Sequence, residues 1–171
     1  HYTFSDVFAQ ESKELEHSAK RYYAEIMMPF RMMCKKYTQM IKDMNVDMVL
    51  PSHGPVYTRP DFILDLYADW TADTPKNLVV MPYVSMYEST KEMIDYLSDR
   101  LNEKGIQTFK FDIVDDDLGD LAMSLVDAAT IVMGTSMVLA GPHPMAVNVA
   151  YLAAVLRPKA KFASLVGSYG W

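Results

Sequence analysis

The residues best suited to chemistry lie in three short loops, each of which follows a run that is typical of a buried strand. The loops span residues 85–90, 135–144 and 167–171. Hydroxyl groups and main-chain N–H groups at a helix start bind phosphate, and the first loop is rich in Ser and Thr. The later loops add side chains that suit a flat ring, namely Met137, Leu139, Tyr169 and Trp171. Together the loops offer donors for a phosphate and surfaces for a ring.

The first loop is the main phosphate candidate, because it connects a predicted strand to a predicted helix. In that arrangement the free N–H groups and the positive end of the helix dipole face the loop. A simple N-capping loop is the alternative, since Ser89 and Thr90 are both good helix caps. Glu88 would repel a phosphate unless its carboxylate turns outward.

Two other places offer possible metal ligands. His53 lies in the turn Pro51–Pro55, after the apolar run 48–50, and an imidazole at the end of a strand is placed where ligands are often held. A solvated loop histidine is the alternative, because one histidine does not define a metal site. The acidic run Asp115–Asp117 offers three carboxylates, but just before a helix they also suit the helix dipole, and we favour that interpretation.

Alternating strands and helices position the three loops. The expected strands are 78–84, 106–113, 130–134 and 161–166, and the expected helices are 91–104, 118–126 and 145–156. This order predicts a parallel α/β sheet, in which ligands bind at the carboxyl ends of the strands where the strand order reverses. All three loops belong to that edge and predict a site for an isoalloxazine nucleotide. No Gly-x-Gly-x-x-Gly follows the first strand, which disfavours a dinucleotide.

The first part of the chain is expected to be helical. Apolar residues recur with helical spacing from about residue 17 to residue 44, and Pro29 inside this run predicts a kink or a break. The methionines of this run are predicted to fill a core rather than to line a cofactor site. They are Met27, Met28, Met32, Met33, Met40 and Met44.

A polar linker is expected to divide the chain. Residues 45–50 indicate a short strand, and residues 60–70 indicate a helix with Pro60 in its first turn. The run 71–76 is polar and contains a proline, which predicts a boundary between domains 1–73 and 74–171. Because the chain starts with a histidine and stops just after an apolar strand, we expect a fragment. Pro82 also requires a bulge or an unpaired N–H side in the first strand of the second domain.

The composition excludes several classes of protein. The 171 residues are 50% hydrophobic and carry a formal net charge of -6, which supports a packed core and disfavours binding to nucleic acid. The longest apolar runs are too short to span a membrane. The single cysteine, Cys34, cannot form an internal disulfide and fits a reducing, cytoplasmic setting.

Four motifs, in this order, resemble those of the flavodiiron proteins, also called A-type flavoproteins. They are Pro51-Ser52-His53-Gly54-Pro55 with Leu66-Tyr67 and Trp70, Ser85-Met86-Tyr87-Glu88-Ser89-Thr90, Gly134-Thr135-Ser136 with Gly141-Pro142-His143-Pro144, and Gly167-Ser168-Tyr169-Gly170-Trp171. The resemblance covers about residues 20–171. The Gly-Pro-His-Pro form of the third motif is most similar to members that take electrons from a reduced deazaflavin coenzyme.

The resemblance implies the C-terminal part of a metallo-β-lactamase-like domain, followed by a flavodoxin-like, doubly wound parallel sheet that lacks its last strand and helix. Family members pass electrons from a reduced donor, a deazaflavin coenzyme or a rubredoxin-like protein, through FMN to a non-haem diiron centre. That centre reduces dioxygen to water or nitric oxide to nitrous oxide, and members are head-to-tail homodimers. His53 matches an iron ligand. The residues that match the FMN loops are Ser85, Met86, Tyr87, Glu88, Ser89, Thr90, Thr135, Ser136, Met137, Val138, Leu139, Ala140, Ser168, Tyr169, Gly170 and Trp171.

The resemblance is incomplete at its metal site. The other iron ligands of the family have no match in this sequence, so we do not expect this chain alone to hold a diiron centre or to reduce a gas. Two alternatives remain: an FMN-binding electron-transfer module, and a metallo-β-lactamase-type hydrolase in which His53 serves a zinc pair. Bound flavin would favour either redox hypothesis, and zinc would favour the hydrolase.

Overall fold

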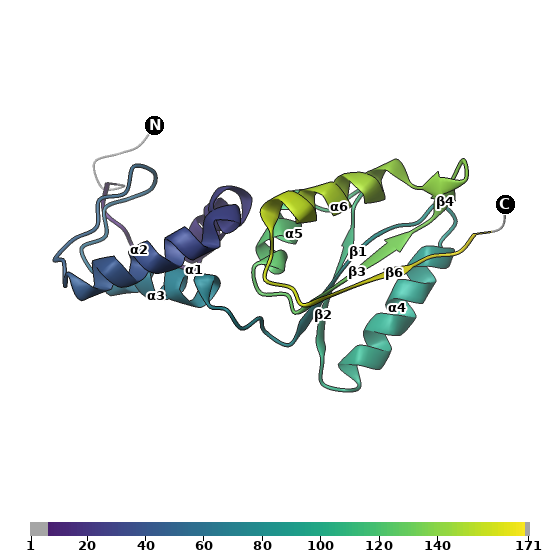
Figure 1. The fold of residues 1–171 in the computed structure, drawn as a ribbon, viewed down its shortest axis with the longest axis horizontal. Helices are drawn as coiled ribbons and strands as arrows, with labels where there is room; N and C mark the ends of the chain where they lie inside the picture. Colours follow the sequence, from purple (N-terminus) through teal and green to yellow (C-terminus); the bar gives the residue numbers. More distant parts are fainter. Residues whose placement is uncertain (1–6, 170–171) are drawn as a thin grey trace. The chain divides into compact units, whose positions relative to one another are not determined.

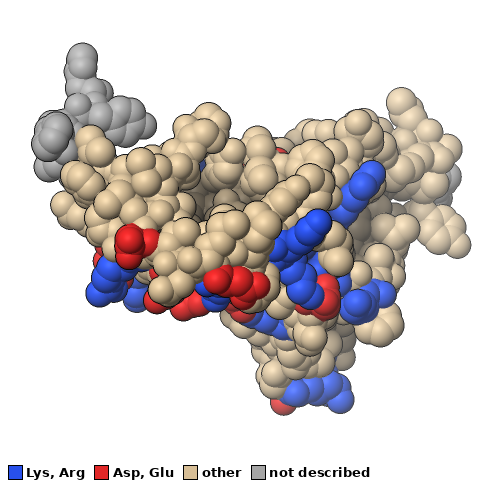
Figure 2. Space-filling model, turned by 60° about the vertical axis from the view of Figure 1, so that its left-hand side comes forward, with Lys and Arg blue, Asp and Glu red and all other residues tan. Residues whose placement is uncertain are grey.

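The chain forms two compact units, His1–Ala72 and Asp73–Trp171, and the computed structural model describes residues 7–169 (Figure 1). Within that range no helix has both the length and the apolar character needed to cross a membrane. Lys and Arg side chains lie among Asp and Glu side chains on the face shown in Figure 2, and much of that face carries neither. This face therefore offers no continuous basic surface.

The first unit is built on a helical run that changes its winding. α1 (Lys13–Tyr22) continues into a π-helical segment, η2 (Tyr23–Met27), then into a 3₁₀ turn, η3 (Met28–Phe30), and finally into α2 (Arg31–Asp43). Pro29 lies in the 3₁₀ turn, because proline has no N–H to donate and its ring crowds the preceding turn. The predicted break at Pro29 is confirmed.

An aromatic cluster joins this helical run to α3 (Pro60–Thr71). Tyr23, Tyr67 and Trp70 pack together with ring centroids 5.3 to 5.5 Å apart. Tyr23 and Trp70 are buried. Burial also raises the pKa of Tyr67 to about 12, because a tyrosinate there would lose its hydration. The cluster gives the first unit an aromatic core.

The strand predicted over residues 45–50 is wrong. Val49 forms only an isolated bridge with Tyr57, in which each N–H donates to the other residue's carbonyl oxygen at 2.9 Å. Pro51 and Pro55 follow within the same connection and supply no N–H groups, so a longer ladder has no donors at those positions.

The predicted burial of the methionines is also mostly wrong. Met28 is buried and Met27 is half-buried, whereas the remaining four methionines are exposed. The exposed ones are Met32, Met33, Met40 and Met44. Helical spacing predicted that these residues share a side, but it did not determine whether that side is buried.

The second unit is a parallel sheet with helices on both faces, which confirms the predicted α/β class. The strands are β1 (Leu78–Val84), β2 (Gln107–Asp112), β3 (Thr130–Thr135) and β6 (Phe162–Val166), in the order β2-β1-β3-β6. The helices are α4 (Ser89–Asn102), α5 (Leu118–Leu125) and α6 (Pro144–Leu156). In Figure 1, α4 covers one face of the sheet, and α5 and α6 cover the other.

β1 is the central strand, and each of its residues is buried. On the α4 face its side chains pack with Ile94 and Val132 in the main core of the unit. Pro82 pairs in register with β2, while the ladder to β3 skips Met81 and Pro82 and resumes at Tyr83 without a change of register. The prediction that Pro82 needs an unpaired N–H side is therefore confirmed, and no bulge is required.

One element inside the predicted loop 135–144 was not expected. β4 (Met137–Val138) and β5 (Gly141–Pro142) form a small antiparallel hairpin. Its two turn residues, Leu139 and Ala140, have φ of 49° and 61°. Hairpin turns with two left-handed residues normally use Asn-Gly or Gly-Gly, and Leu-Ala carries no such signal.

Candidate functional site

The three predicted loops meet at the carboxyl edge of the sheet. They follow β1, β3 and β6, which are adjacent strands. From β1 the chain passes outward to β2, and from β2 it crosses to β3 on the other side of β1. The sheet therefore reverses its winding between β1 and β3, which is where open α/β sheets hold their ligands.

Close backbone contact joins the second and third loops. A Cβ added at Gly167 would lie 2.3 Å from the carbonyl oxygen of Thr135. No side chain fits in that space, so glycine allows the chain after β6 to run directly beside the end of β3. Ser168 and Tyr169 continue from this contact, and Tyr169 is 86% exposed. Gly170 and Trp171 lie outside the described residues.

The first loop presents unpaired donors beside the start of α4. The Ser85 Oγ accepts a hydrogen bond from the N–H of Lys91 at 3.4 Å, and the N–H of Ser89 donates to the Tyr87 carbonyl oxygen at 2.8 Å. Within the described residues, the N–H groups of four loop positions have no hydrogen-bond acceptor. These positions are Met86, Tyr87, Glu88 and Thr90. Several uncommitted donors therefore lie beside the helix start.

The N-capping alternative for Ser89 and Thr90 is wrong. Both residues lie inside α4, and Glu88 occupies the cap position without accepting a hydrogen bond through its side chain. The backbone of Glu88 is left-handed, with φ of 64°, a conformation that favours glycine. The side chain of Glu88 is 67% exposed and forms an ion pair with Lys91, with Oε2 3.1 Å from Nζ. The hydrogen bond between these two side chains, together with the negative charge of Glu88, raises the pKa of Lys91.

Two hydroxyl groups at this edge are buried without partners. Thr90 is 0% exposed, and its Oγ1 has no hydrogen-bond partner; the Oγ of Ser136, in the loop after β3, is also buried and unpaired. A buried hydroxyl without a partner costs free energy, so such groups call for an explanation. A phosphate bound at this edge would supply acceptors that the protein itself does not.

The second loop is held together through His143. Thr135 Oγ1 donates to the Ser136 carbonyl oxygen at 2.9 Å and accepts from the N–H of His143 at 3.2 Å. The His143 Nδ1 in turn accepts from the N–H of Met145 at 3.2 Å and caps α6. The intervening hairpin places Leu139 at its tip, 97% exposed. Sequence reasoning placed His143 in a motif but missed its capping role, for which the following Pro144 was the available signal.

Asp117 confirms the dipole interpretation of the acidic run. Its Oδ1 accepts from the N–H of Gly119 at 2.6 Å and caps α5, while Asp116 accepts from the N–H of Asp112 at 2.7 Å. The carboxylates of Asp116 and Asp117 thus accept hydrogen bonds from the local backbone. Among residues 7–169, no group of three or more His, Cys, Asp or Glu side chains could hold a metal ion.

His53 lies in the first unit at the border of an apolar cavity of about 590 Å³. Its ring is exposed and lies 5.7 Å from the ring of Tyr22, at an interplanar angle of 41°. The same cavity is lined by Cys34, whose thiol pKa is raised by burial. The described residues around His53 do not complete a metal site.

Relatives of known identity resemble this chain over its whole length. The anaerobic nitric oxide reductase flavorubredoxin of Salmonella paratyphi A is 30% identical over 178 residues, which cover 100% of this chain and 37% of that protein. The flavodiiron protein of Giardia intestinalis has a similar fold, with a TM-score of 0.87 at 22% identity over 100% of this chain and 43% of that one. This chain is therefore similar in sequence to a nitric oxide reductase flavorubredoxin and similar in fold to a flavodiiron protein. No family model matches it.

A second solved structure also has a similar fold. The rubredoxin oxygen:oxidoreductase of Desulfovibrio gigas gives a TM-score of 0.84 at 23% identity, over 97% of this chain and 46% of that one. The flavodoxin-like sheet predicted for the second unit is therefore confirmed at the level of the fold. The chain spans 37% to 44% of the length of three curated relatives to which it is similar.

Proposed function

We propose that the second unit binds FMN at the edge formed by the loops after β1, β3 and β6. One observation carries this proposal: residues 85–90 hold unpaired N–H donors and the buried, partnerless Thr90 hydroxyl at the point where the sheet reverses its winding. A phosphate monoester matches these groups, since its oxygens accept several hydrogen bonds at once.

Different loops would bind different parts of FMN. The N–H groups of Met86, Tyr87, Glu88 and Thr90 would hold the phosphate, together with the hydroxyls of Ser85, Ser89 and Thr90. The other two loops would hold the isoalloxazine ring, mainly through their apolar and aromatic side chains. The residues proposed for the ring are Met137, Val138, Leu139 and Ala140 after β3, with Thr135 and Ser136 as polar neighbours, and Ser168, Tyr169, Gly170 and Trp171 after β6, of which Gly170 and Trp171 lie outside the described residues.

We further propose that the longer protein represented by this chain is an oxidoreductase that passes electrons to a gas. FMN, when bound, supplies the one- and two-electron chemistry that such a relay needs. The names of the relatives support a reductase of nitric oxide or of oxygen. A reduced deazaflavin coenzyme or a rubredoxin-like protein remains our proposed donor, and a head-to-tail homodimer our proposed assembly.

The diiron centre does not fit the residues described for this chain. His53 is a single candidate ligand, and no cluster of three metal-binding side chains occurs in residues 7–169. A diiron site needs several nitrogen and oxygen ligands around each metal. We therefore propose His53 as a ligand that other parts of the longer protein would have to complete, and we derive no catalytic step from it.

Titration of the chain with FMN tests the main proposal. We expect saturable quenching of FMN fluorescence, with riboflavin, which lacks the phosphate, binding at least about tenfold more weakly, because it forgoes the charge-assisted hydrogen bonds of the first loop. Equal affinity for both ligands would mean that residues 85–90 are not a phosphate site. The absence of saturable binding of either flavin would refute the proposal as a whole.

A further inference from the structure

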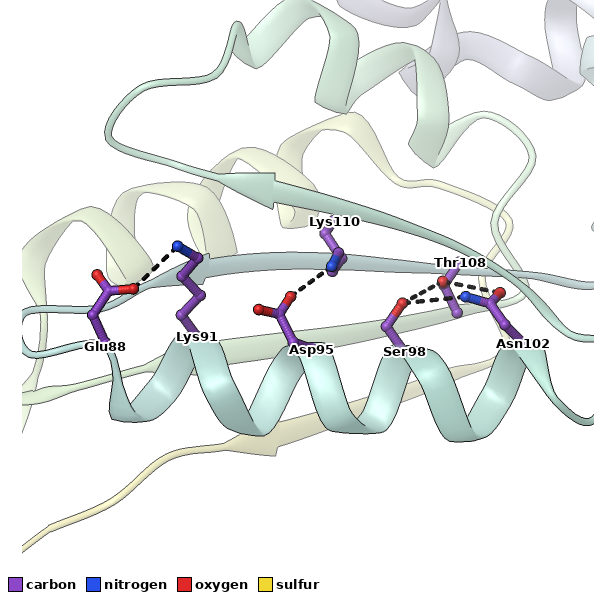
Figure 3. A network of polar contacts seen from close by, with 7 residues as sticks. All are labelled: Glu88, Lys91, Asp95, Ser98, Asn102, Thr108 and Lys110. Atoms are coloured by element: carbon purple, nitrogen blue, oxygen red, sulfur yellow. Dashed lines mark hydrogen bonds and ion pairs between the residues drawn. The ribbon is translucent and has the colours of Figure 1, made fainter.

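The charges around the proposed phosphate loop are unusual, because the loop itself carries a carboxylate. Glu88 occupies the cap position of α4, where an anionic ligand at the helix start would meet it. The only cation within its first turn is Lys91, whose Nζ lies 3.1 Å from the Glu88 Oε2. Figure 3 shows the two side chains reaching toward one another along α4.

The first turn of α4 carries a second carboxylate, Glu92, and the next charges along the helix pair with one another or with β2. Asp95, one turn further along, pairs with Lys110 of β2 at 2.5 Å, and beyond it Ser98, Asn102 and Thr108 form a hydrogen-bonded group (Figure 3). In the first turn of α4 the basic residue is therefore Lys91, and its partner is Glu88.

The loop holds the backbone of Lys91 but leaves its side chain adjustable. Its N–H donates to the Oγ of Ser85, so the residue is tied to the first position of the proposed phosphate loop. Its ammonium group stands on a flexible four-carbon stem, and the side chain is 45% exposed. Glu88 is 67% exposed, so water can solvate its carboxylate once the pair separates. The ion pair between Lys91 and Glu88 can thus separate without burying either charge.

We propose that Lys91 changes partner when a phosphorylated ligand binds: its ammonium group leaves Glu88 and pairs with the phosphate, while the Glu88 carboxylate turns to solvent. This inference rests on the proposed binding of FMN and concerns how the site selects a phosphorylated flavin. A phosphate dianion attracts the ammonium more strongly than one carboxylate does at the same distance. In the free protein, Glu88 keeps Lys91 close to the loop, and in the complex Lys91 offsets the repulsion between Glu88 and the phosphate.

The test compares FMN and riboflavin binding to variants of the full chain by fluorescence quenching. In Lys91→Met the stem is kept and the charge removed; we expect FMN to bind about tenfold more weakly and riboflavin to bind as before. Lys91→Arg, the matched control, keeps the charge and should stay within about threefold of the wild type for FMN. Glu88→Gln should bind FMN about threefold more tightly, because it frees Lys91 and removes a carboxylate. Both positions are exposed, so circular dichroism should show unchanged folding.

The possible outcomes distinguish the partner exchange of Lys91 from the proposed binding of FMN. If the wild type prefers FMN over riboflavin but Lys91→Met keeps the same preference, the partner exchange is refuted and FMN binding stands. If Lys91→Met weakens FMN and riboflavin equally, Lys91 acts on the fold of the loop rather than on the phosphate, and the exchange is again refuted. If the wild type binds neither flavin, both the proposed function and the partner exchange are refuted.

Discussion

Replacing Thr90 by valine tests the phosphate loop through two measurements that should move in opposite directions. The Thr90 Oγ1 is fully buried without a hydrogen-bond partner in the free protein. Valine has nearly the same shape and no hydroxyl, so the variant loses an unsatisfied group and no contact. Relief of an unpaired buried hydroxyl is worth about 1 kcal/mol, which predicts equal or higher stability and a rise in Tm of about 2 to 4 °C.

The same substitution should weaken FMN binding. If the hydroxyl donates to the phosphate, its loss removes a charge-assisted hydrogen bond and should lower the affinity about tenfold, or about 1.4 kcal/mol. Thr90→Ser keeps the hydroxyl and is the matched control for affinity. Thermal unfolding by circular dichroism and FMN titration give the two values. Unchanged FMN affinity in Thr90→Val would refute the assignment of this hydroxyl, and a loss of stability above about 1 kcal/mol would show that it has a partner within the protein.

Three further predictions concern the loop contact, the aromatic cluster and the histidine. Gly167→Ala should lower the free energy of unfolding by about 1 to 3 kcal/mol and weaken FMN binding, because its Cβ would lie 2.3 Å from the Thr135 carbonyl oxygen. The control is Gly141→Ala, whose Cβ would lie 3.7 Å from the Val138 carbonyl oxygen and which should change neither value. Chemical denaturation and FMN titration measure the two values. The pKa of Tyr67 is raised to about 12, so between about pH 10 and 12 this side chain ionises in the unfolded chain but stays protonated in the folded one. The free energy of unfolding should therefore fall as pH rises through that range. Tyr67→Phe should remove this part of the pH dependence when unfolding is measured against pH. In the full-length protein, His53→Ala should lower the iron content and abolish gas reduction while the donor still reduces the flavin, and equal loss of both activities would contradict the metal-ligand assignment.

Much of the second unit was predictable because its signals are local. The unbroken apolar run of β1 and the alternation of strands with amphipathic helices indicate a parallel sheet, whatever surrounds them. The carboxyl ends of such strands necessarily share an edge, so the three loops could be assigned to one site before their geometry was known. Pro29 and Asp117 were predictable for a similar reason, since their effects act within one turn of the backbone.

The predictions that failed depend on what lies across from a residue rather than beside it. Helical spacing showed that the methionines of α2 share a side, but whether that side is buried depends on the element packed against it. Residues 45–50 have the composition of a strand, yet a strand needs a partner with free donors, and Val49 found only Tyr57. The hairpin at Leu139 had no turn signal at all.

By itself, the sequence determined the class of the fold, the edge at which the loops gather and the family that the motifs resemble, because apolar period and motif order are properties of a linear chain. Only the tertiary structure decided which of the loop groups are unsatisfied. The way the loop joins α4 produces three features: the left-handed backbone of Glu88, its ion pair with Lys91, and the buried Thr90 hydroxyl that has no partner. Hydrogen-bond satisfaction is a property of neighbours in space, and the proposed phosphate site is defined by donors that the fold leaves without them.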